Sequence, residues 1–600
     1  MIRSLAKSGY QFAKRSPLLR RIARTPMIAR LKSRVAPWVL LGDSEYERWM
    51  ANRLTTRHVN YPCSPEPGLL SLLTTAWNTP PQYLQILADS VLQQQGVTDF
   101  EWIVLDNGST KPTTRKLLDE IAASDPRVQL LRVEDNLGIV GGMRVALEQA
   151  TGRYVLPVDS DDYLYPDCLQ VVTSCLQRHN HPAILYSDED HLLGRKFVLP
   201  YFKPDWDPVL FQSCAYIAHL GVFDRRRALE LGVYSDPRMN GCHDWDTFER
   251  FRQAGHLPRH IPEVLYSWRM HSGSTAANIN SKAYIRKSHR ALLTGVLQRQ
   301  PHPERFELEL NPLFHGTPDW RFRRLAGDGR PLLRVTVGAE VNVGWAPCPS
   351  DKGSQRSEVR GQKSEVSGQE SAVVGEAHPT DDLAIAVSRH VALCDLLNII
   401  RDHADPNGLV AFVSDDVSIE SPDWMWEASG LFELHPDTAV VGGRIVNHRN
   451  VVLDAGRVLG FGRGCDSPER GRSVEDPGYY AQVWKPRSVS AVSTQFCVFE
   501  TRFLCDLLAT LADQPATLPY LGAWAGAFAK QTGRRIITSP FLLGRTNEDW
   551  DDFTTDVERA AFAMASRDLW PDTRFYPRCF GSDAMHAYDL SVEVRVSEAA

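Results

Sequence analysis

The stretch Val158-Asp159-Ser160-Asp161-Asp162 closes an apolar run that begins at Tyr154. Such a run predicts a buried strand, so the three carboxylates stand where the strand ends. Clustered carboxylates repel one another unless a cation neutralises them, and Mg²⁺ commonly shares its ligands between protein carboxylates and substrate phosphates. We therefore hypothesise a metal–diphosphate site here, with an acidic turn as the alternative.

The composition is that of a globular chain with several domains. Of its 600 residues, 43% are hydrophobic and 23% are charged, which is enough apolar material for more than one core. The net charge of −6 argues against a nucleic-acid-binding protein. The eleven cysteines are odd in number and include no Cys-x-x-Cys pair, which favours a reducing compartment over a disulfide framework or a structural zinc site. Because no apolar stretch reaches membrane-spanning length and no signal-peptide core is visible, we expect a cytoplasmic protein.

Residues 1–42 differ from the rest of the chain and predict a basic amphipathic arm. Residues 1–36 carry ten Lys and Arg side chains among apolar ones, and the first acidic residue is Asp43. A cationic, partly apolar helix can lie on an anionic membrane surface, so one expectation is a peripheral location at the inner face of the cytoplasmic membrane. Pro17 and Pro26 interrupt the pattern, and a solvated basic tail or a helix docked on another subunit are alternatives.

Strands alternate with helices upstream of the acidic stretch. Residues 68–76 form an apolar run that ends at Trp77, and residues 100–105 form a second run that ends at Asp106. This alternation predicts right-handed βαβ units in a mostly parallel sheet, where ligands bind at the carboxyl ends of the strands. Trp77, Asp106 and Asp159 should therefore share one cleft.

Asp106 has two interpretations. Its carboxylate can accept hydrogen bonds from a nucleobase or from ribose hydroxyls, or it can cap the turn made by Asn107-Gly108. We favour the ligand role, because the strand of Asp106 neighbours the acidic one.

Six motifs follow one another in a fixed order along the first half of the chain. They are Trp77-Asn78-Thr79-Pro80, Asp106-Asn107-Gly108-Ser109-Thr110, Asn136-Leu137-Gly138, Asp159-Ser160-Asp161-Asp162, Tyr186-Ser187-Asp188-Glu189-Asp190 and Phe202-Lys203-Pro204-Asp205-Trp206. This ordered set resembles a family 2 glycosyltransferase of the GT-A fold. The last two motifs are similar to the branch that builds bacterial surface polysaccharide, including O-antigen, with rhamnosyltransferase-like members. The resemblance covers about residues 66 to 300 and implies a catalytic, α/β, Rossmann-like GT-A domain over residues 43–300.

The resemblance also implies roles for individual residues. The family's catalytic carboxylate lies in a Glu-Asp or Gln-Asp pair that begins a helix, which matches Asp244, although His243 replaces the usual Glu or Gln. Lys111 and Arg144 also depart from the family pattern and add positive charge near the expected diphosphate. The remaining implied roles are donor binding by Thr75, Trp77, Asp106 and Asp159, binding of a divalent metal (Mg or Mn) by Asp161 and His271, and an acceptor side formed by Asp188, Glu189 and Trp206.

These roles imply an inverting, metal-dependent transfer of a sugar from a dTDP- or UDP-sugar donor to a glycan or lipid-linked glycan acceptor. Asp244 would take a proton from the acceptor hydroxyl as that hydroxyl attacks the anomeric carbon. The alternative from another class is a non-catalytic glycan-binding or scaffold protein of a polysaccharide-assembly complex. A nucleotidyltransferase would share the fold class and the acidic site.

The second half resembles a degenerate GT-A-like domain over residues 382–600. Residues 301–348 are expected to form a connector and the first strand of that domain. Residues 349–381, rich in Ser, Gly, Gln, Glu and Lys, predict a disordered insertion.

An apolar run followed by Asp415-Asp416 repeats the layout of the first half. The family's catalytic position falls near Gly522-Ala523-Trp524, which has no carboxylate, and no histidine occurs within residues 541–545. We therefore expect this half to be a platform for an acceptor glycan or a partner subunit rather than a second active site.

Overall fold

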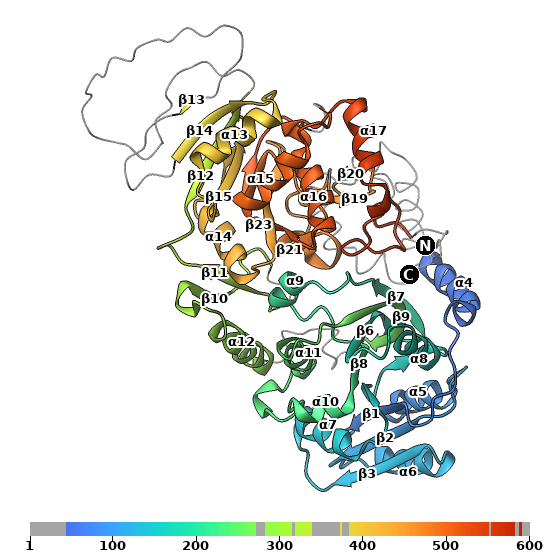
Figure 1. Ribbon diagram of the computed structural model, residues 1–600. Coiled ribbons are helices and arrows are strands. Elements are labelled where there is room, and N and C mark those ends of the chain that lie inside the picture. The colour runs from blue at the N-terminus through green and yellow to red at the C-terminus, as the bar shows by residue number, and fades with distance from the viewer. Residues whose placement is uncertain are drawn as a thin grey trace, which may run out of the picture.

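The computed structural model describes residues 44–271, 283–314, 318–338, 373–374, 383–550, 554–582 and 587–590. The predicted basic arm, and the predicted insertion apart from two residues, lie outside these ranges. The described chain forms two α/β halves, each built around one large sheet, with the first half below the second in Figure 1.

Four parallel strands form the first part of the front sheet. They are β1 (Leu70–Ala76), β2 (Glu101–Asn107), β3 (Val128–Val133) and β4 (Tyr154–Pro157). The helices that connect them are α5 (Pro81–Leu92), α6 (Pro112–Ser124) and α7 (Gly138–Gln149). Proline can begin α5 and α6 because the first N–H groups of a helix have no partner within it.

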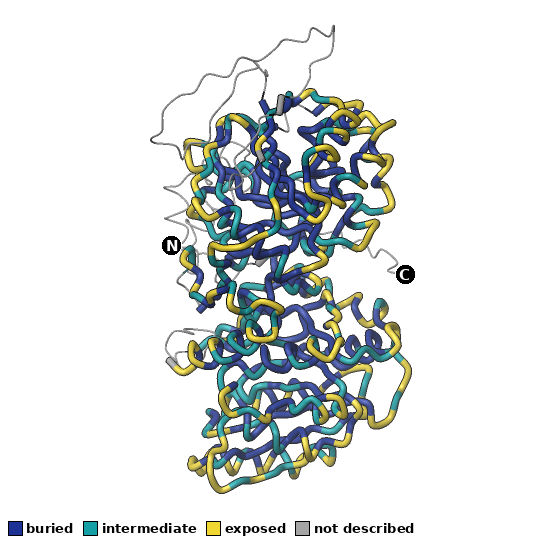
Figure 2. The backbone as a smooth tube through the Cα atoms, turned by 60° about the vertical axis from the view of Figure 1, so that its left-hand side comes forward, coloured by how far each residue is buried: buried dark blue, intermediate teal, exposed yellow. Residues whose placement is uncertain are grey.

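Both faces of β1, β2 and β4 are buried, which explains why their sequences are almost continuously apolar, whereas β3 at the edge of the sheet is only partly buried. Successive residues point to opposite faces: Leu73 packs in a cluster with Met143 of α7, while Leu72 packs in a cluster with Leu84 of α5. The buried backbone runs through the middle of each half in Figure 2.

Beyond β4 the front sheet continues with strands of mixed direction. They are β5 (Tyr163–Leu164), β6 (Ile184–Leu193), β7 (Lys196–Tyr201), β8 (Gly221–Asp224) and β9 (Arg259–Arg269). The order across the sheet is β3-β2-β1-β4-β8-β6-β9-β5, and β7 pairs with β6. The helices of this part are α8 (Cys168–Arg178), α9 (Pro208–Ser213), α10 (Arg225–Glu230) and α11 (His243–Gln253).

Helix α4 (Ser44–Asn60) docks on the front half through buried polar contacts. The hydroxyl of Tyr46 donates a hydrogen bond to Asp190 of β6 at 2.5 Å, and Arg57 Nε donates one to Asp167 at 2.7 Å. On the other side, α12 (Ala283–Gln298) and the hairpin of β10 (Phe306–Leu310) and β11 (Trp320–Arg324) lead to the second half.

The second half contains a second large sheet. Its strands are β12 (Leu332–Gly338), β13 (Val373–Val374), β14 (Leu383–Ser388), β15 (Leu409–Ser414), β16 (Ser418–Ile419), β17 (Thr438–Val446), β18 (Val452–Asp454), β21 (Arg487–Val489), β22 (Phe496–Glu500) and β23 (Arg535–Arg545). Its helices are α13 (Leu393–His403), α14 (Trp424–Leu434), α15 (Thr501–Thr510), α16 (Leu521–Gln531) and α17 (Asp556–Ala565), and β19 (Val458–Leu459) pairs with β20 (Cys465–Asp466) in a separate ribbon.

The second sheet repeats the order of the first. Its path β14-β12-β15-β22-β17-β23-β16 corresponds strand for strand to β2-β1-β4-β8-β6-β9-β5, with the same parallel and antiparallel neighbours. The difference lies at the edge, where the position of β3 is held by the two-residue antiparallel strand β13. The predicted fold class, a GT-A-like sheet followed by a second related one, is therefore confirmed.

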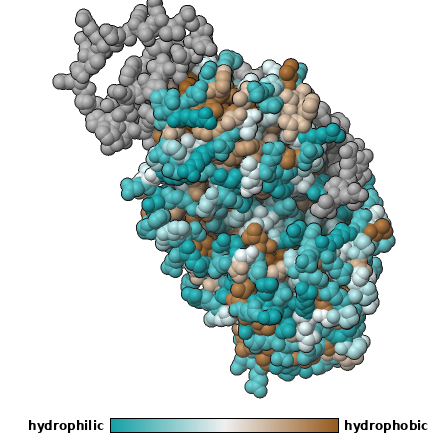
Figure 3. Space-filling model, viewed as in Figure 1, coloured by the Kyte–Doolittle hydropathy of each residue, from teal (hydrophilic) through white to brown (hydrophobic). Residues whose placement is uncertain are grey.

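The face of the molecule that Figure 3 shows is mainly polar. On the face shown in Figure 3, hydrophilic residues predominate and apolar residues lie in small, separate groups. Among the described helices, none combines the length and apolar character that crossing a membrane requires.

Candidate active site

Hydrogen bonds join the strand-end motifs into one edge of the front sheet. These bonds connect the loops that follow β1, β2 and β4 with one another and with the segment that precedes α7. The hydroxyls of Thr79 and Ser160 lie 2.7 Å apart, Asn78 N donates to Ser109 Oγ at 3.0 Å, and Leu137 N donates to Asn107 Oδ1 at 3.0 Å.

The three aspartates after β4 have different surroundings. Asp159 is partly exposed, and its backbone N–H donates a hydrogen bond to the hydroxyl of Tyr266 at 3.1 Å. Partial burial and the neighbouring carboxylates of Asp161 and Asp244 raise the pKa of Asp159. A carboxylate whose charge is unfavourable in this way gains from a cation nearby.

Asp162 is buried and structural. Its carboxylate accepts hydrogen bonds from Tyr266 Oη at 2.6 Å and from the backbone N–H of Arg269 at 2.8 Å, so it ties the loop to β9. Burial, together with the charges of Asp161 and Asp159, raises the pKa of Asp162 well above its usual value. Although atoms of Asp159, Asp162 and His219 lie within 4.8 Å of one another, both oxygens of Asp162 are already engaged, so we do not assign a metal to this group.

Asp161 and His271, the metal ligands that the resemblance implies, lie next to each other. Asp161 Oδ2 is 2.9 Å from His271 Nε2, and each side chain is 28% exposed. The ring of His271 packs 5.4 Å from that of Tyr83. A carboxylate oxygen and an imidazole nitrogen at the rim of a cleft form a donor set that fits Mn²⁺ or Mg²⁺, with imidazole suiting Mn²⁺ better.

Asp244 lies in the first turn of α11, beside His243. His243 Nε2 is 2.9 Å from Asp244 Oδ1. Burial alone would raise the pKa of Asp244, but the charge and hydrogen bond of His243 outweigh it and lower this pKa. The helix N-terminus adds positive potential that also favours the ionised carboxylate.

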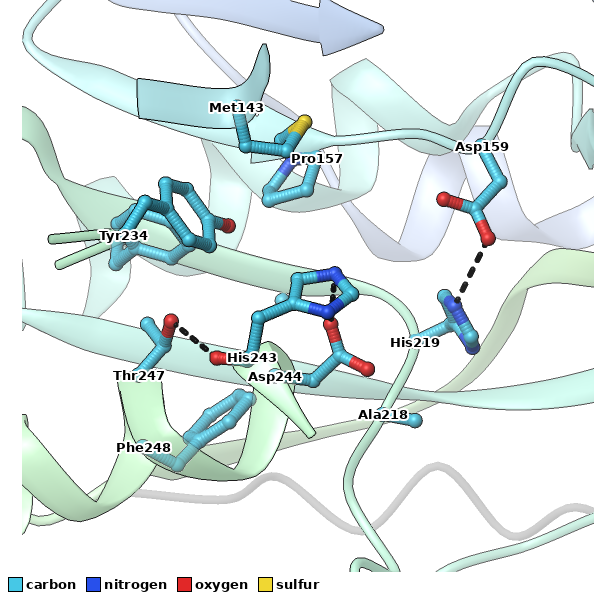
Figure 4. Close-up of a pocket in the computed structure, with 12 residues that line it drawn as sticks. Met143, Pro157, Asp159, Ala218, His219, Tyr234, His243, Asp244, Thr247 and Phe248 are labelled. Atoms are coloured by element: carbon cyan, nitrogen blue, oxygen red, sulfur yellow. Dashed lines mark hydrogen bonds and ion pairs between the residues drawn. The ribbon is translucent and has the colours of Figure 1, made fainter. Parts of the chain in front are cut away.

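A narrow pocket separates Asp244 from the acidic loop. Asp159 at the end of β4 and Asp244 at the start of α11 both line it, together with His219, Tyr234 and His243 (Figure 4). Two carboxylates from separate elements therefore line one small pocket, which is the arrangement that a base and a donor-side acid require.

His219 is a site residue that the sequence analysis missed. Its Nε2 lies 3.9 Å from Asp159 Oδ2 and its Nδ1 lies 3.6 Å from Glu189 Oε2. The ring stacks on Tyr266 with a centroid distance of 4.7 Å. Burial opposes the charged form, but Glu189 and Asp159 outweigh it and raise the pKa of His219 to about 9. His219 therefore presents a positive charge between the two carboxylates at neutral pH.

Lys203 completes this network from the other side. Its ammonium group lies 3.1 Å from Glu189 Oε2 and donates a hydrogen bond to the carbonyl of Ser187 at 2.7 Å. Burial would raise the pKa of Glu189, but Lys203 and His219 outweigh it and lower this pKa to about 2. Glu189, predicted to lie on the acceptor side, is thus a buried support for His219.

Asp188 and Trp206, the other predicted acceptor-side residues, lie apart from the pocket. Asp188 is buried, and its Oδ1 is 2.8 Å from Nε2 of His260, whose Nδ1 is 3.0 Å from Asp205 Oδ1. Trp206 is half-buried and packs on Phe211 of α9 at 4.8 Å.

The predicted donor-binding residues lie along the ends of β1 and β2. Thr75 is half-buried and Trp77 is 55% exposed. Asp106 is buried, and its Oδ1 accepts a hydrogen bond from Ser109 N at 3.0 Å while its Oδ2 lies 3.4 Å from Arg132 Nε. The turn-capping alternative for Asp106 is therefore realised in this structure. The expectation that the strand of Asp106 neighbours the acidic strand is wrong, because β1 lies between β2 and β4.

The corresponding site of the second half is filled. Helix α16 occupies the place of α11, and its first residues, Leu521 to Trp524, are buried and carry no carboxylate. A Cβ atom added to Gly522 would lie 2.0 Å from the carbonyl oxygen of Val492, so the helix start is packed directly against backbone. Asp416 is bonded to the hydroxyls of Ser414 and Thr546.

Comparison with known proteins shows which proteins this chain is similar to. Residues 71–196 match the family described as Glycosyl transferase family 2. The uncharacterized protein y4gI of Sinorhizobium fredii is 28% identical over 475 residues, which are 75% of this chain and 50% of that protein. The O-antigen biosynthesis protein RfbC of Myxococcus xanthus is 24% identical over 447 residues, 72% of this chain and 34% of that protein. The chain thus spans half or less of these relatives.

Among solved structures, S. aureus TarS 1-349 in complex with UDP-GlcNAc aligns with 38% of this chain and 67% of that chain, at 20% identity and a TM-score of 0.32. The matched segment of the family runs from β1 to the start of β7 and contains the strand-end motifs and the acidic loop. The part of this chain that is similar to glycosyltransferase family 2 therefore lies in the first half, over residues 71–196.

Proposed function

We propose that this chain is an inverting, metal-dependent glycosyltransferase that moves a sugar from a dTDP- or UDP-sugar to a growing bacterial surface polysaccharide or lipid-linked glycan. The family 2 domain supports sugar transfer. The name of the RfbC relative, and a 25% match over 234 residues to the hyaluronan synthase of Pasteurella multocida, support a glycan product.

The observation that carries the proposal is the position of Asp244 across the pocket from Asp159. Asp244 is the carboxylate of α11 that lines the pocket, and His243 holds it ionised. An ionised carboxylate in this position can accept the proton of an acceptor hydroxyl. Direct attack by that hydroxyl on the far side of the sugar inverts the anomeric carbon and needs no second carboxylate as nucleophile.

Asp161 and His271 are the residues that would hold a divalent cation. When bound, such a cation supplies positive charge that stabilises the diphosphate leaving group. His219 contributes a second positive charge on the same side of the pocket, and Tyr266, through its bonds to Asp159 and Asp162, fixes the loop that carries these acids. Thr75, Trp77 and Asp106 would bind the nucleoside part of the donor.

The second half is proposed to be non-catalytic, because the position of the base is buried and apolar. The basic arm at residues 1–36, which lies outside the described residues, is proposed to contact the membrane surface beside a lipid-linked acceptor. Removing residues 1–36 and measuring membrane partition tests that part separately.

The central test is a donor screen. Purified full-length chain is incubated with a panel of dTDP- and UDP-sugars and Mn²⁺ or Mg²⁺, and release of free nucleotide is measured with and without a bacterial lipid or glycan extract. Asp244→Asn should reduce turnover by at least about a hundredfold, because a general base contributes 10²–10⁴ in rate, and should leave nucleotide binding nearly unchanged.

Asp246→Asn is the matched control, since Asp246 lies in the same helical turn but pairs with Arg250 at 2.6 Å. Turnover that survives Asp244→Asn would refute the base assignment. If no sugar nucleotide is bound or hydrolysed by the wild-type chain, the scaffold alternative would replace the enzyme.

A further inference from the structure

The second half of the chain holds one peptide of the first half through hydrogen bonds and ring stacking. This peptide, residues 199–207, runs from the end of β7 to the start of α9 and contains Lys203. In Figure 1, α9 and β7 lie at the boundary, facing the second half.

On the N-terminal side of Lys203, the peptide is contacted by Tyr479 and Tyr480 of the second half. The hydroxyl of Tyr480 donates a hydrogen bond to the carbonyl of Leu199 at 2.7 Å, and its ring stacks on Tyr201 at 3.8 Å. The hydroxyl of Tyr479 donates to the carbonyl of Pro200 at 2.8 Å and accepts from the N–H of Phe202 at 2.9 Å. The four consecutive residues before Lys203, 199–202, are therefore each hydrogen-bonded or stacked by a tyrosine of the second half.

On the C-terminal side of Lys203, two further residues of the peptide are hydrogen-bonded to the second half. Asp205 N donates to the carbonyl of Arg574 at 2.7 Å. The carboxylate of Asp207 accepts hydrogen bonds from Ser488 N at 2.8 Å and Ser488 Oγ at 2.7 Å. Both contacts are with the second half, so Lys203 lies between two fixed points.

The loop that carries Tyr479 and Tyr480 has an uncommon backbone conformation. Tyr480 and Ala481 have positive φ angles of 48° and 58°, and Leu199 opposite them has a φ of 51°. Non-glycine residues keep such angles only where the surrounding contacts enforce them. The strained backbone on both sides of this interface indicates that the tyrosine contacts are specific.

Lys203 connects the 199–207 peptide to the pocket. Its backbone N–H donates to Asp188 Oδ1 at 2.8 Å, and its ammonium group bonds to Glu189 and to the carbonyl of His219. His219 in turn faces Asp159. A continuous line of contacts therefore runs from Tyr480 through Leu199 to Lys203 and on to the pocket.

We propose that the second half acts as a positioning domain: through Tyr479, Tyr480 and Ser488 it holds the 199–207 peptide so that Lys203 keeps Glu189 and His219 in place beside Asp159. These are positioning residues, since none of them lines the pocket. The catalytic meaning of the proposal rests on the proposed function, but the mechanical coupling does not.

Amide hydrogen exchange of the full-length chain tests the coupling. In the double variant Tyr479→Phe/Tyr480→Phe, amide exchange in residues 196–207 and 215–222 should accelerate. We expect about fivefold to tenfold for each hydroxyl removed, because the loss of one buried hydrogen bond shifts the local unfolding equilibrium by a factor of about this size. Strand β2, on the far side of the front sheet, should exchange as in the wild type.

Ser566→Ala is the matched control. Ser566 also donates a buried hydroxyl to a carbonyl, that of Phe562 at 2.6 Å, but does so within the second half, at the end of α17. It should not change exchange in residues 196–207. Ser488→Ala provides an independent arm that loosens the other end of the peptide and serves as the test if the double variant fails to fold.

If residues 196–207 exchange at the same rate in the double variant, in Ser488→Ala and in the control, the proposal is overturned. Where the donor screen yields a substrate, the double variant should lower kcat/KM for the donor about tenfold, as a slight misplacement of site residues does, because His219 lies beside Asp159, a proposed donor-binding residue. A wild-type chain without transferase activity but with this exchange pattern would refute only the proposed function.

Discussion

The histidine that precedes the proposed base changes how the base titrates. His243 lies 2.9 Å from Asp244, in a position where the resembled family carries Glu or Gln. Its charge and hydrogen bond overcome the effect of burial and lower the pKa of Asp244. The carboxylate is therefore ionised over a wide pH range, at the cost of basicity.

Replacing His243 should shift the acidic limb of the pH–rate profile to higher pH. In His243→Gln, burial would dominate and raise the pKa of Asp244, so the base would be protonated, and inactive, up to a higher pH. The measurement is kcat/KM against pH, from about pH 4 to 8, a range that covers the ordinary carboxyl and imidazole pKa values. His256→Gln, beyond the far end of α11, should leave the limb in place. An unmoved limb in His243→Gln would mean that another group sets it.

The carboxylates of the site could be picked out from the sequence, but two of their cationic partners, His219 and Lys203, could not. Asp159, Asp161 and Asp244 follow a strand or begin a helix within recognisable motifs. His219 and Lys203 lie in irregular segments, and they meet Glu189 only because β7 folds back on β6 and β8 pairs beside it. Local periodicity does not encode such pairings.

At the scale of elements, α11 and α16 occupy equivalent places in two similar sheets, but only the start of α11 lines a pocket. Each helix precedes the long last strand of its sheet, β9 or β23. The start of α11 is polar and lines a pocket, whereas the start of α16 is buried against the backbone of Val492. The absence of a carboxylate near Gly522 could be predicted from the sequence, but the closure of the space around it depends on packing with a distant loop.

Gly522 should tolerate no side chain. A Cβ at this position would lie 2.0 Å from the carbonyl oxygen of Val492, so Gly522→Ala should destabilise the second half by about 1–3 kcal/mol, as overpacking does. Chemical denaturation measures the loss. Gly295→Ala in α12, where the nearest atom is the end of the Arg299 side chain at 3.4 Å, is the control and should stabilise by about 0.5–1 kcal/mol. Equal stability of the two variants would show that the start of α16 can shift.

The sheet framework could be predicted only in part. The parallel strands β1 to β4 follow from apolar runs with helices between them. The insertion of β8 antiparallel between β4 and β6 could not, since it joins segments about 70 residues apart through a two-residue register. The repeat in the second half was indicated by Asp415-Asp416, while the substitution of β3 by β13 depends on residues with no strand pattern of their own.

For the whole molecule, a buried histidine lies next to the joint between the halves. His260 bridges Asp188 and Asp205, and Asp205 is bonded to Arg574 of the second half. Burial opposes its charge, but the two carboxylates outweigh burial and raise the pKa of His260 to about 9. The folded chain thus binds this proton more tightly than the unfolded chain does.

Stability should therefore decline at alkaline pH. A raised folded-state pKa stabilises fully below the unfolded value of 6.5, and this contribution is lost as the pH rises to about 9. We expect the free energy of unfolding to fall by up to about 3 kcal/mol over this range, measured by denaturant titration. His260→Gln should flatten the decline but not abolish it, because the pKa of His219 is also raised to about 9. A decline of the same size in the variant would exclude His260 as its source.

The contact of the second half with residues 199–207 also has a consequence during synthesis. Leu199 and its partner Tyr480 are 281 positions apart, so the ribosome must add a further 280 or so residues before the tyrosine can arrive. At 5–20 residues per second, that interval is roughly 15 to 60 s. Throughout it, the nascent first half carries every carboxylate of its pocket while the second half does not yet hold the Lys203 peptide, so competence would be acquired only after the segment around Tyr480 has been synthesised.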